Sequence, residues 1–277
     1  MSPSLVTAEA LHVALPNHSA KRPFRPAPLA PILHGVDFAI GRGEAVGIVG
    51  ESGSGKTTLG RALVRLLAPT SGRLTFDGQD ITHAGETTLR PLRARMQMIF
   101  QNPLASLNPR RSIAASVAAP LWARGDRTAL RDRALAALER AGLASGLADR
   151  YPHQLSGGQR QRVGIARAIV TEPDFILADE IVSGLDVVTQ AQILDLLREL
   201  RRDMGLALAF ITHDLSVVRV LCERVVVMHQ GRIVEQGETA AMFAAPQHPY
   251  TRRLLAAVPL PDIDDGWLDA DVDVDAS

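Results

Sequence analysis

The chain has 277 residues, 46% of them hydrophobic, so it is long and apolar enough to bury a sizeable core and is not a disordered chain. Its 30 Lys and Arg residues balance 30 Asp and Glu residues, which gives no overall electrostatic footprint for nucleic acid. The single cysteine, Cys222, excludes an intrachain disulfide and a cysteine-held iron–sulfur cluster, and we expect it to be a buried structural thiol.

Neither a leader nor a membrane span is predicted. The first residues lack the basic start and the apolar core of a signal peptide. The longest mostly apolar stretch, residues 113–123, is interrupted by Pro120 and is too short to cross a bilayer. We therefore expect the protein to work in the cytosol and to reach a membrane only through a partner.

The first part of the chain predicts a loop, a strand and a helix in turn. Residues 16–31 contain five prolines, which block helix formation and favour a loop or a long hairpin connection. Residues 46–49 form an aliphatic run typical of a buried parallel strand, and residues 58–67 space their leucines as a helix does. Residues 74–76 predict a strand that ends in an Asp-Gly turn.

From residue 96 onwards strands alternate with helices, apart from one helical block at 102–168 whose clearest helix is expected over 126–143. The other expected elements are a strand at 96–100, a helix at 159–170, a strand at 175–178, an amphipathic helix at 188–202, a strand at 206–212, and a hairpin of strands at 225–228 and 232–235. This alternation predicts an α/β fold with a mostly parallel sheet, into which the helical block is inserted as a subdomain. Seven aspartates and no basic residue in 262–277 indicate a solvated, disordered tail.

Residues 50–57 read G-E-S-G-S-G-K-T, between an expected strand and an expected helix. This is the setting of a phosphate-binding loop, in which glycines let backbone N–H groups point at phosphate oxygens and the helix adds its positive end. Lys56, one of only two lysines in the chain, is expected to reach the β- and γ-phosphates, and the Thr57 hydroxyl to bind Mg²⁺. A glycine-rich turn without a ligand is the alternative.

Polar residues follow three of the expected strands, at the edge of a parallel sheet where ligands bind. Asp179 and Glu180 follow the strand at 175–178, and they face the glycine loop if the two strands are neighbours. Asp179 would then hold Mg²⁺ through water, and Glu180 would orient or activate the attacking water. His213 is a candidate γ-phosphate contact, and Gln101 is a candidate contact to Mg²⁺ or water that reports the nucleotide state. Each residue also has an alternative without a ligand. Asp179 and Glu180 could be a helix cap with a solvated neighbour, His213 a core or surface histidine, and Gln101 a simple turn residue.

A second anion site is predicted where residues 155–159 read L-S-G-G-Q and open a helix. A second γ-phosphate site for the same ATP would crowd the first, so we expect this segment to face a different chain. Its backbone N–H groups would then cap the γ-phosphate held by the partner's loop, and each such bond to a charged acceptor is worth about 1.5–3 kcal/mol. An ordinary helix N-cap is the alternative.

Together with residues 183–186, these segments resemble the nucleotide-binding subunit of an ABC transporter. The phosphate loop is shared by many NTPases, whereas the run L-S-G-G-Q-R-Q-R is highly specific, and the likeness covers about residues 5–262. A closer similarity, to the ATPases of oligopeptide, dipeptide and nickel importers, rests on residues 98–103, 106–110 and 187–197, and above all on H-P-Y-T at 248–251 followed by V-P-L-P at 258–261.

The resemblance implies a P-loop NTPase of the RecA-like α/β fold, with a mostly parallel sheet, an N-terminal antiparallel β subdomain and an inserted α-helical subdomain. It implies ATP and Mg²⁺ as cofactors. The residues implied to bind nucleotide are Gly50, Glu51, Ser52, Gly53, Ser54, Gly55, Lys56, Thr57 and Thr58 and, toward a partner's nucleotide or at the dimer seam, Ser156, Gly157, Gly158, Gln159 and Asp186. Those implied to bind Mg²⁺ are Thr57, Gln101 and Asp179, and those implied to act in hydrolysis are Glu180, His213 as the switch histidine, and Gln101.

The resemblance also implies an organisation and a role. An ABC ATPase domain would cover residues 5–262, with the helical subdomain at about 102–168, a family-specific C-terminal segment at about 238–262 and the acidic tail at 263–277. The implied function is ATP hydrolysis that drives bacterial uptake of peptides or a related small solute such as nickel. The implied partners are a second ATPase subunit, two transmembrane permease subunits and, indirectly, an extracytoplasmic substrate-binding protein, with no nucleic acid. The chain would lie peripherally on the cytoplasmic face of the inner membrane, and the region after Gln101 would receive a helix of the membrane subunit.

The sequence departs from this family at three places near the site. Ile181 follows Glu180 where proline is usual, and Gly184 stands where alanine is common. Residues 11–15 lack the usual aromatic side chain that stacks on adenine, and Phe24 is a candidate substitute.

Two other functions remain as alternatives. A soluble ABC-type ATPase acting on the ribosome or on DNA tends to carry two cassettes or a long coiled-coil insert, whereas this chain has one L-S-G-G-Q segment. A degenerate regulatory cassette would bind ATP without turnover, and Glu180 and His213 argue against it.

Overall fold

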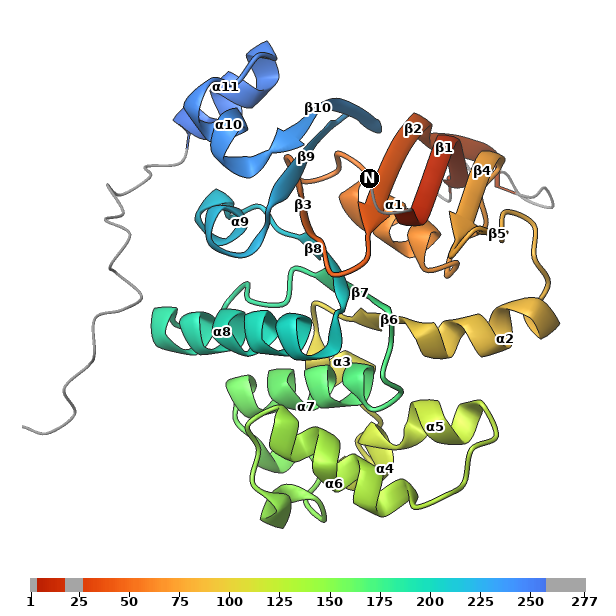
Figure 1. Ribbon diagram of the computed structural model, residues 1–277, viewed down its shortest axis with the longest axis vertical. Helices are drawn as coiled ribbons and strands as arrows, with labels where there is room; N and C mark the ends of the chain where they lie inside the picture. Colours follow the sequence, from red (N-terminus) through yellow and green to blue (C-terminus); the bar gives the residue numbers. More distant parts are fainter. Residues whose placement is uncertain (1–3, 18–26, 258–277) are drawn as a thin grey trace, which may run out of the picture.

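The computed structural model describes residues 4–17 and 27–257, which form two sheets with helices around them and a group of helices at one end (Figure 1). Phe24, residues 258–261 and the expected acidic tail lie outside the described residues.

Four strands from the first third of the chain form an antiparallel sheet in the order β2-β1-β4-β5. They are β1 (Ser4–Pro16), β2 (Leu29–Gly41), β4 (Ser71–Phe76) and β5 (Gln79–Asp80). β1 pairs with β2 along its whole length, and these strands include Pro16 and residues 29–31 of the proline-rich stretch. Residues 18–26 of that stretch, which was expected to be a loop or a long hairpin connection, lie outside the described residues. The expected N-terminal antiparallel unit is confirmed.

Six strands form the second sheet, in the order β10-β9-β3-β8-β7-β6. They are β3 (Ala45–Val49), β6 (Met96–Ile99), β7 (Phe175–Asp179), β8 (Ala207–Ile211), β9 (Arg224–His229) and β10 (Arg232–Glu238). All neighbours are parallel except β9 and β10, whose hairpin turns at Gln230 and Gly231 with φ of 47° and 74°. Every residue of β3, β7 and β8 is buried, which explains their unbroken apolar runs. The expected mostly parallel sheet is confirmed.

The helices divide into two groups. Those packed around the sheets are α1 (Lys56–Leu63), α2 (Glu86–Arg95), α8 (Val187–Met204), α9 (Leu215–Leu221), α10 (Thr239–Ala244) and α11 (Pro249–Ala256). Those of the insert are α3 (Pro103–Ser106), α4 (Ile113–Val117), α5 (Ala119–Ala123), α6 (Leu130–Arg140) and α7 (Gly157–Ile169), with single 3₁₀ turns at Ser145–Leu147 and Pro152–Gln154. The insert occupies the lower end of Figure 1, in yellow and green.

Two helix boundaries predicted from spacing are wrong. The helix expected over 58–67 begins at Lys56 and ends at Leu63, because Arg65 adopts a left-handed backbone with φ of 54°. The helix expected over 126–143 is shorter, since Ala129 has φ of 44° and α6 begins only after it. Neither Arg65 nor Ala129 is a glycine or an asparagine, so no turn signal in the sequence marks the end of α1 or the start of α6. The end of α6 at Arg140 differs, because Gly142 with φ of 70° follows it.

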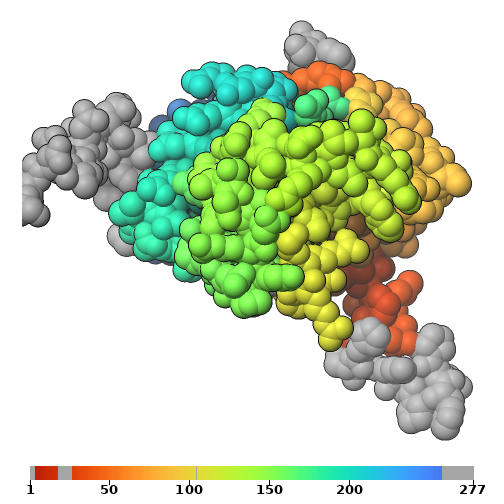
Figure 2. Space-filling view, turned by 90° about the horizontal axis from the view of Figure 1, so that it is seen from below, coloured from red at the N-terminus to blue at the C-terminus, as the bar shows by residue number. Residues whose placement is uncertain are grey.

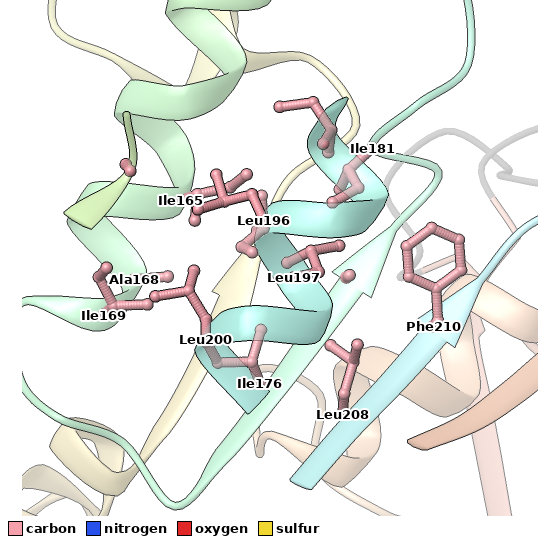
Figure 3. Packing of buried hydrophobic residues seen from close by; sticks show 14 of the residues in the cluster. Ile165, Ala168, Ile169, Ile176, Ile181, Leu196, Leu197, Leu200, Leu208 and Phe210 are labelled. Atoms are coloured by element: carbon pink, nitrogen blue, oxygen red, sulfur yellow. The ribbon is translucent and has the colours of Figure 1, made fainter. Parts of the chain in front are cut away.

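The insert is joined to the sheet by shared apolar packing. Figure 3 shows Ile165 and Ile169 of α7 against Leu196 and Leu200 of α8, which in turn lie over Ile176 of β7. In the space-filling view from below, the green surface of the insert adjoins the cyan surface that follows it in the chain (Figure 2). Fully burying a leucine or isoleucine side chain contributes about 1.5–3 kcal/mol, so this contact holds α7 firmly on the sheet domain.

Cys222, just after α9, is buried as expected, and burial raises the pKa of its thiol well above the ordinary value. Among the described residues no helix is both long enough and apolar enough to cross a membrane.

Candidate active site

The glycine loop connects β3 to α1 and owes its path to two glycines. Gly50 has φ of 148°, and a Cβ added there would lie 2.2 Å from the carbonyl oxygen of Met228. Gly55 has φ of 101° immediately before α1. A Cβ on Gly53 would meet nothing within 4 Å, so the backbone there faces open space. The loop therefore presents exposed backbone in front of a helix N-terminus, which is the geometry of an anion site.

Lys56 lies across this loop. Its Nζ donates hydrogen bonds of 2.8 Å to the carbonyl oxygens of Gly50 and of Glu51. Burial lowers the pKa of Lys56, although the carboxylates of Glu180 and Asp179 act in the opposite direction. Backbone carbonyls thus hold the ammonium group in place at the loop. A negatively charged ligand would offset the free-energy cost of burying this charge.

Ser54 gives a separate indication that the loop fits a phosphate. Its hydroxyl is buried and has no hydrogen-bond partner among the described residues. Such a group costs folding free energy unless a ligand or water satisfies it. Of the remaining loop residues, Glu51 and Ser52 have exposed side chains and Thr57 and Thr58 are half-buried. The residues present therefore fit a triphosphate.

The phosphate loop meets Asp179 by a route that the sequence did not predict. The condition under which this contact was expected, that β3 and β7 be neighbours, is not met, because β8 lies between them. The contact is made instead by Thr57 of α1, whose hydroxyl donates a hydrogen bond of 3.1 Å to Oδ1 of Asp179. Burial raises the pKa of Asp179 despite this bond and the nearby Arg61. A buried carboxylate beside a threonine hydroxyl offers the oxygen ligands that Mg²⁺ prefers.

Glu180 lies between the two other strand-end residues. Its Oε2 accepts a 2.7 Å hydrogen bond from Nε2 of Gln101, and its Oε1 is 3.7 Å from Nδ1 of His213. The His213 side chain is 64% exposed and the Glu180 side chain only 22%. The ends of β6, β7 and β8 thus bring together the three residues implied to act in hydrolysis. A cavity of about 440 Å³ opens beside them, lined by Thr57, Arg61, Phe100, Gln101, Asn102, Ala105, Ser106 and Asp179.

The backbone at Glu180 is held in an unusual conformation. Its φ is 49°, in the left-handed region that side chains other than glycine rarely adopt, and its N–H donates to the carbonyl oxygen of Ile211 at 2.9 Å. Ile181, which replaces the usual proline, is 2% exposed and belongs to the apolar core (Figure 3). Gly184 has φ of 76°, which gives a physical reason for glycine there in place of alanine.

The L-S-G-G-Q segment forms a capping box at the start of α7. The Ser156 hydroxyl accepts from the N–H of Gln159 at 3.2 Å, and Oε1 of Gln159 accepts from the N–H of Ser156 at 3.0 Å. A Cβ on Gly158 would lie 2.8 Å from Cγ2 of Thr189, so this glycine allows the close approach of α7 to α8. Gly157 is exposed at the first position of the helix. Helix-capping side chains thus fix the shape of the segment and satisfy the N–H groups of Ser156 and Gln159, which leaves those of Gly157 and Gly158 to other partners.

The segment is not brought to the phosphate loop of its own chain. α7 and α1 lie in different parts of the molecule (Figure 1), and no hydrogen bond or ion pair among the described residues joins 156–159 to 50–58. Asp186, implied to lie at a dimer seam, caps α8 by accepting from the N–H and the hydroxyl of Thr189 at 2.8 and 2.7 Å. These hydrogen bonds lower the pKa of Asp186.

One residue at the loop was not predicted. Tyr250 of α11 accepts a hydrogen bond from the backbone N–H of Glu51 at 2.9 Å. In the sequence, the His-Pro-Tyr-Thr segment at 248–251 indicates only the family. A buried aromatic hydroxyl needs a partner, but nothing in the spacing identified one 199 residues away.

Comparison with known proteins gives the site its context. The family model described as "ABC transporter" matches residues 33–183, more than half of the chain. A second model, "Oligopeptide/dipeptide transporter, C-terminal region", matches residues 234–272. A putative peptide import ATP-binding protein of Brucella ovis is 52% identical over 235 residues, which cover 84% of this chain and 74% of that protein. The oligopeptide transport ATP-binding protein OppF of Salmonella typhimurium is 47% identical over 233 residues, covering 83% and 70%.

Solved structures agree with these sequence relatives. The ATP-binding cassette MJ0796, solved as a dimer with ADP and Pi, superposes with a TM-score of 0.73 at 30% identity and covers 84% of this chain and 98% of that one. CbiO1 from Clostridium perfringens, part of the ABC transporter complex cbiONQ, superposes with a TM-score of 0.74 at 31% identity, covering 87% and 91%. These findings support the transporter hypothesis and not the soluble ATPase or the degenerate cassette. The chain belongs to the ABC transporter family, as a transport-coupled ATPase subunit that carries the oligopeptide/dipeptide transporter C-terminal region.

Proposed function

We propose that this chain hydrolyses ATP to drive the import of peptides or related small solutes through a membrane permease. The observation that carries the proposal is the meeting of the phosphate loop with Asp179 through Thr57, beside a Glu180 that contacts Gln101. The names of relatives, which refer to peptide import, oligopeptide transport and glutathione import, support a peptide-like cargo. The boundaries predicted for the helical subdomain and the C-terminal segment stay predictions.

The loop residues 50–58 would hold the triphosphate, with Lys56 supplying the positive charge. The oxygen atoms of Thr57, Asp179 and Gln101 would hold Mg²⁺. When bound, Mg²⁺ neutralises charge on the β- and γ-phosphate oxygens. The buried, unpartnered hydroxyl of Ser54 supports a ligand in the loop itself.

Glu180 is the residue that we expect to act on the attacking water. A carboxylate held in one orientation can align a water molecule and accept its proton. The Gln101 amide and the left-handed backbone both restrict this side chain. His213, whose Nδ1 lies 3.7 Å from Oε1 of Glu180, would contact the γ-phosphate.

A second cassette would complete the site. Because residues 156–159 lie away from the loop of their own chain, the N–H groups of Gly157 and Gly158 would serve a nucleotide held by another copy or by a related ATPase subunit. The dimeric structure of the similar cassette with ADP and Pi supports this arrangement. Two transmembrane permease subunits would then place the pair at the cytoplasmic face of the inner membrane, and an extracytoplasmic binding protein would supply the cargo.

The test is Mg²⁺-dependent hydrolysis by the purified chain, measured as phosphate release over a range of protein concentrations. We expect the rate per molecule to rise with concentration as pairs form, and Glu180→Gln to lose turnover while accumulating an ATP-bound dimer on a sizing column. Uptake of a labelled peptide by vesicles with the matching permease would test the cargo. A monomer that turns over at full speed at every concentration would contradict the shared site.

A further inference from the structure

The C-terminal helix α11 reaches the phosphate loop through one side chain. The Tyr250 hydroxyl accepts a hydrogen bond from the backbone N–H of Glu51, with 2.9 Å between nitrogen and oxygen. Tyr250 is 3% exposed, and its ring lies 4.1 Å from the ring of His229, tilted by 33°. His229 is the last residue of β9, so Tyr250 lies between the carboxyl end of β9 and the phosphate loop.

The segment that carries Tyr250 is fixed in place by several hydrogen bonds. The carboxylate of Glu235 in β10 accepts from the N–H groups of Gln247 and His248, at 2.8 and 3.0 Å. Burial acts to raise the pKa of Glu235, but the backbone hydrogen bonds from Gln247 and His248 act against it and the pKa is lowered. Nδ1 of His248 then caps α11 by accepting from the N–H of Tyr250 at 3.1 Å. These hydrogen bonds therefore fix the N-terminus of α11, from which the Tyr250 hydroxyl contacts the loop.

The loop receives support from two different elements. On one side, Gly231 of the β9–β10 turn donates to the carbonyl oxygen of Ser54 at 2.9 Å, and Gly50 packs closely against Met228. On the other side, the N–H of Glu51, the first residue after Gly50, finds its acceptor among the described residues in Tyr250. The bond to Tyr250 fixes the direction of the Glu51 N–H at the start of the loop, whose later peptide units would face a phosphate.

We infer that Tyr250 is a positioning residue that holds the entrance of the phosphate loop in its nucleotide-accepting shape. The C-terminal segment thereby sets nucleotide affinity, in addition to marking the family. The inference rests on the proposed ATP site and adds a residue that lies outside the loop and outside the strand ends. It assigns a physical role to two side chains of the segment: His248 caps α11, and Tyr250 accepts from the N–H of Glu51.

The alternative is that Tyr250 only fills space. Tyr250→Phe separates the two, because phenylalanine keeps the ring against His229 and removes only the acceptor of the Glu51 N–H. A net contribution typical of one hydrogen bond predicts that nucleotide binds about threefold to tenfold more weakly and that KM for ATP rises by the same factor. The chemical step is untouched, so kcat should change by less than about twofold.

The experiment measures MgADP binding by calorimetry and ATP hydrolysis by phosphate release, on wild type, Tyr250→Phe and Tyr151→Phe. Tyr151 is the other tyrosine of the chain, half-exposed at a 3₁₀ turn, and its variant should match wild type. Melting without nucleotide checks that the fold is intact. Wild-type affinity and KM in Tyr250→Phe, with or without a lower melting temperature, would overturn the inference. A wild-type protein that binds no nucleotide would instead overturn the proposed function.

A second measurement tests the route. In Tyr250→Phe the backbone N–H of Glu51 loses its acceptor, so its hydrogen should exchange with solvent faster than in wild type. Unchanged exchange at Glu51 together with weaker MgADP binding would show that the hydroxyl acts through another group and would refute the assignment.

Discussion

The side-chain amide of Gln101 donates a 2.7 Å hydrogen bond to Oε2 of Glu180. Gln101 lies between β6 and α3, where the chain leaves the sheet for the helical insert, and Glu180 follows β7. One hydrogen bond thus joins the entry of the insert to the carboxylate that we expect to act on water. Any shift of the insert relative to the sheet would alter the orientation of that carboxylate.

Replacing Gln101 should therefore affect turnover more than binding. We expect Gln101→Ala to lower kcat by about tenfold to a hundredfold, because a misplaced catalytic group costs rate even when the ligand still binds. MgADP affinity should fall by no more than about fivefold, because one oxygen ligand of Mg²⁺ is lost while the phosphate loop, Thr57 and Asp179 are unchanged. Gln97→Ala is the matched control, because the side-chain amide of Gln97, in β6, donates to the carbonyl oxygen of Arg93 and does not reach Glu180. Equal kcat values for the two variants would contradict the role of Gln101.

We expect the buried Asp179 carboxylate to lower the free energy of unfolding of the nucleotide-free protein at neutral pH. Burial raises its pKa above the ordinary value of 3.8, so the folded state keeps this proton to higher pH than the unfolded chain does. The contribution of Asp179 to the free energy of unfolding is therefore most favourable below the unfolded pKa. It decreases as pH rises through the folded pKa. We expect nucleotide-free Asp179→Asn to melt at least as high as wild type at neutral pH and to lose less stability between about pH 4 and pH 8.

The same Asp179→Asn variant should lose Mg²⁺-dependent hydrolysis, because the amide lacks the negative charge that attracts the cation. Thermal melting as a function of pH and phosphate release are the two measurements. The Thr57 hydroxyl can still donate to the amide oxygen, so the local packing is kept. A variant that is less stable than wild type at neutral pH would show that the charged carboxylate stabilises the fold.

Ser156 should have two separable roles. Ser156→Ala removes the N-cap of α7 and should lower the free energy of unfolding by about 1 kcal/mol. Ser156→Asp keeps a capping oxygen and should retain stability, but its charge would repel a partner's γ-phosphate and abolish hydrolysis. Chemical denaturation and phosphate release distinguish these effects. If the aspartate variant were stable and fully active, the segment would be an ordinary helix cap.

A ring of four charges should contribute an acid-sensitive share of stability. Arg42 and Arg95 each bond both Asp77 and Asp174, which links the antiparallel sheet to the end of α2 and the start of β7. Hydrogen bonds from Arg95 and Arg42 lower the pKa of Asp77 below 3.8. Its stabilisation is therefore present above the unfolded pKa and is lost as pH falls through the folded pKa.

Asp77→Asn tests this ring. Asparagine tolerates the left-handed φ of 52° at this position, so the backbone should not be strained. Since the side chains are partly exposed, we expect a loss of no more than about 1 kcal/mol at neutral pH, smaller at high salt and vanishing in acid. Urea unfolding at several pH values measures it. An undiminished difference in acid would mean that the asparagine acts through something other than the lost charge.

The chemistry-bearing strand ends could be predicted from sequence, because an aliphatic run that stops at an acidic pair is typical of a buried strand reaching the edge of its sheet. Thus Asp179 and Glu180 were placed correctly at the end of β7. The strand order could not be predicted, because it depends on crossover connections, and β8 proved to lie between β3 and β7. The roles of these residues in hydrolysis stay predictions until the variants are measured.

Helix boundaries failed where ordinary residues turn the chain. Arg65 and Ala129 adopt left-handed conformations without a glycine or asparagine to announce them, since packing and hydrogen bonds elsewhere impose the turn. The contact between Tyr250 and Glu51 was missed for a related reason. It joins two segments 199 residues apart, and only the folded arrangement of β9, β10 and α11 brings them together.

The single thiol of Cys222 makes site-specific labelling practical for measuring the distance between two subunits during ATP hydrolysis. Because that sulfur is enclosed by the protein and resists ionisation, maleimide probes should leave the folded natural chain unlabelled. A cysteine introduced at an exposed position such as Val187 or Val188, at the start of α8, would then be the one reactive thiol available for labelling. Fluorophores or spin labels attached there would report the distance between two subunits as nucleotide is added and consumed.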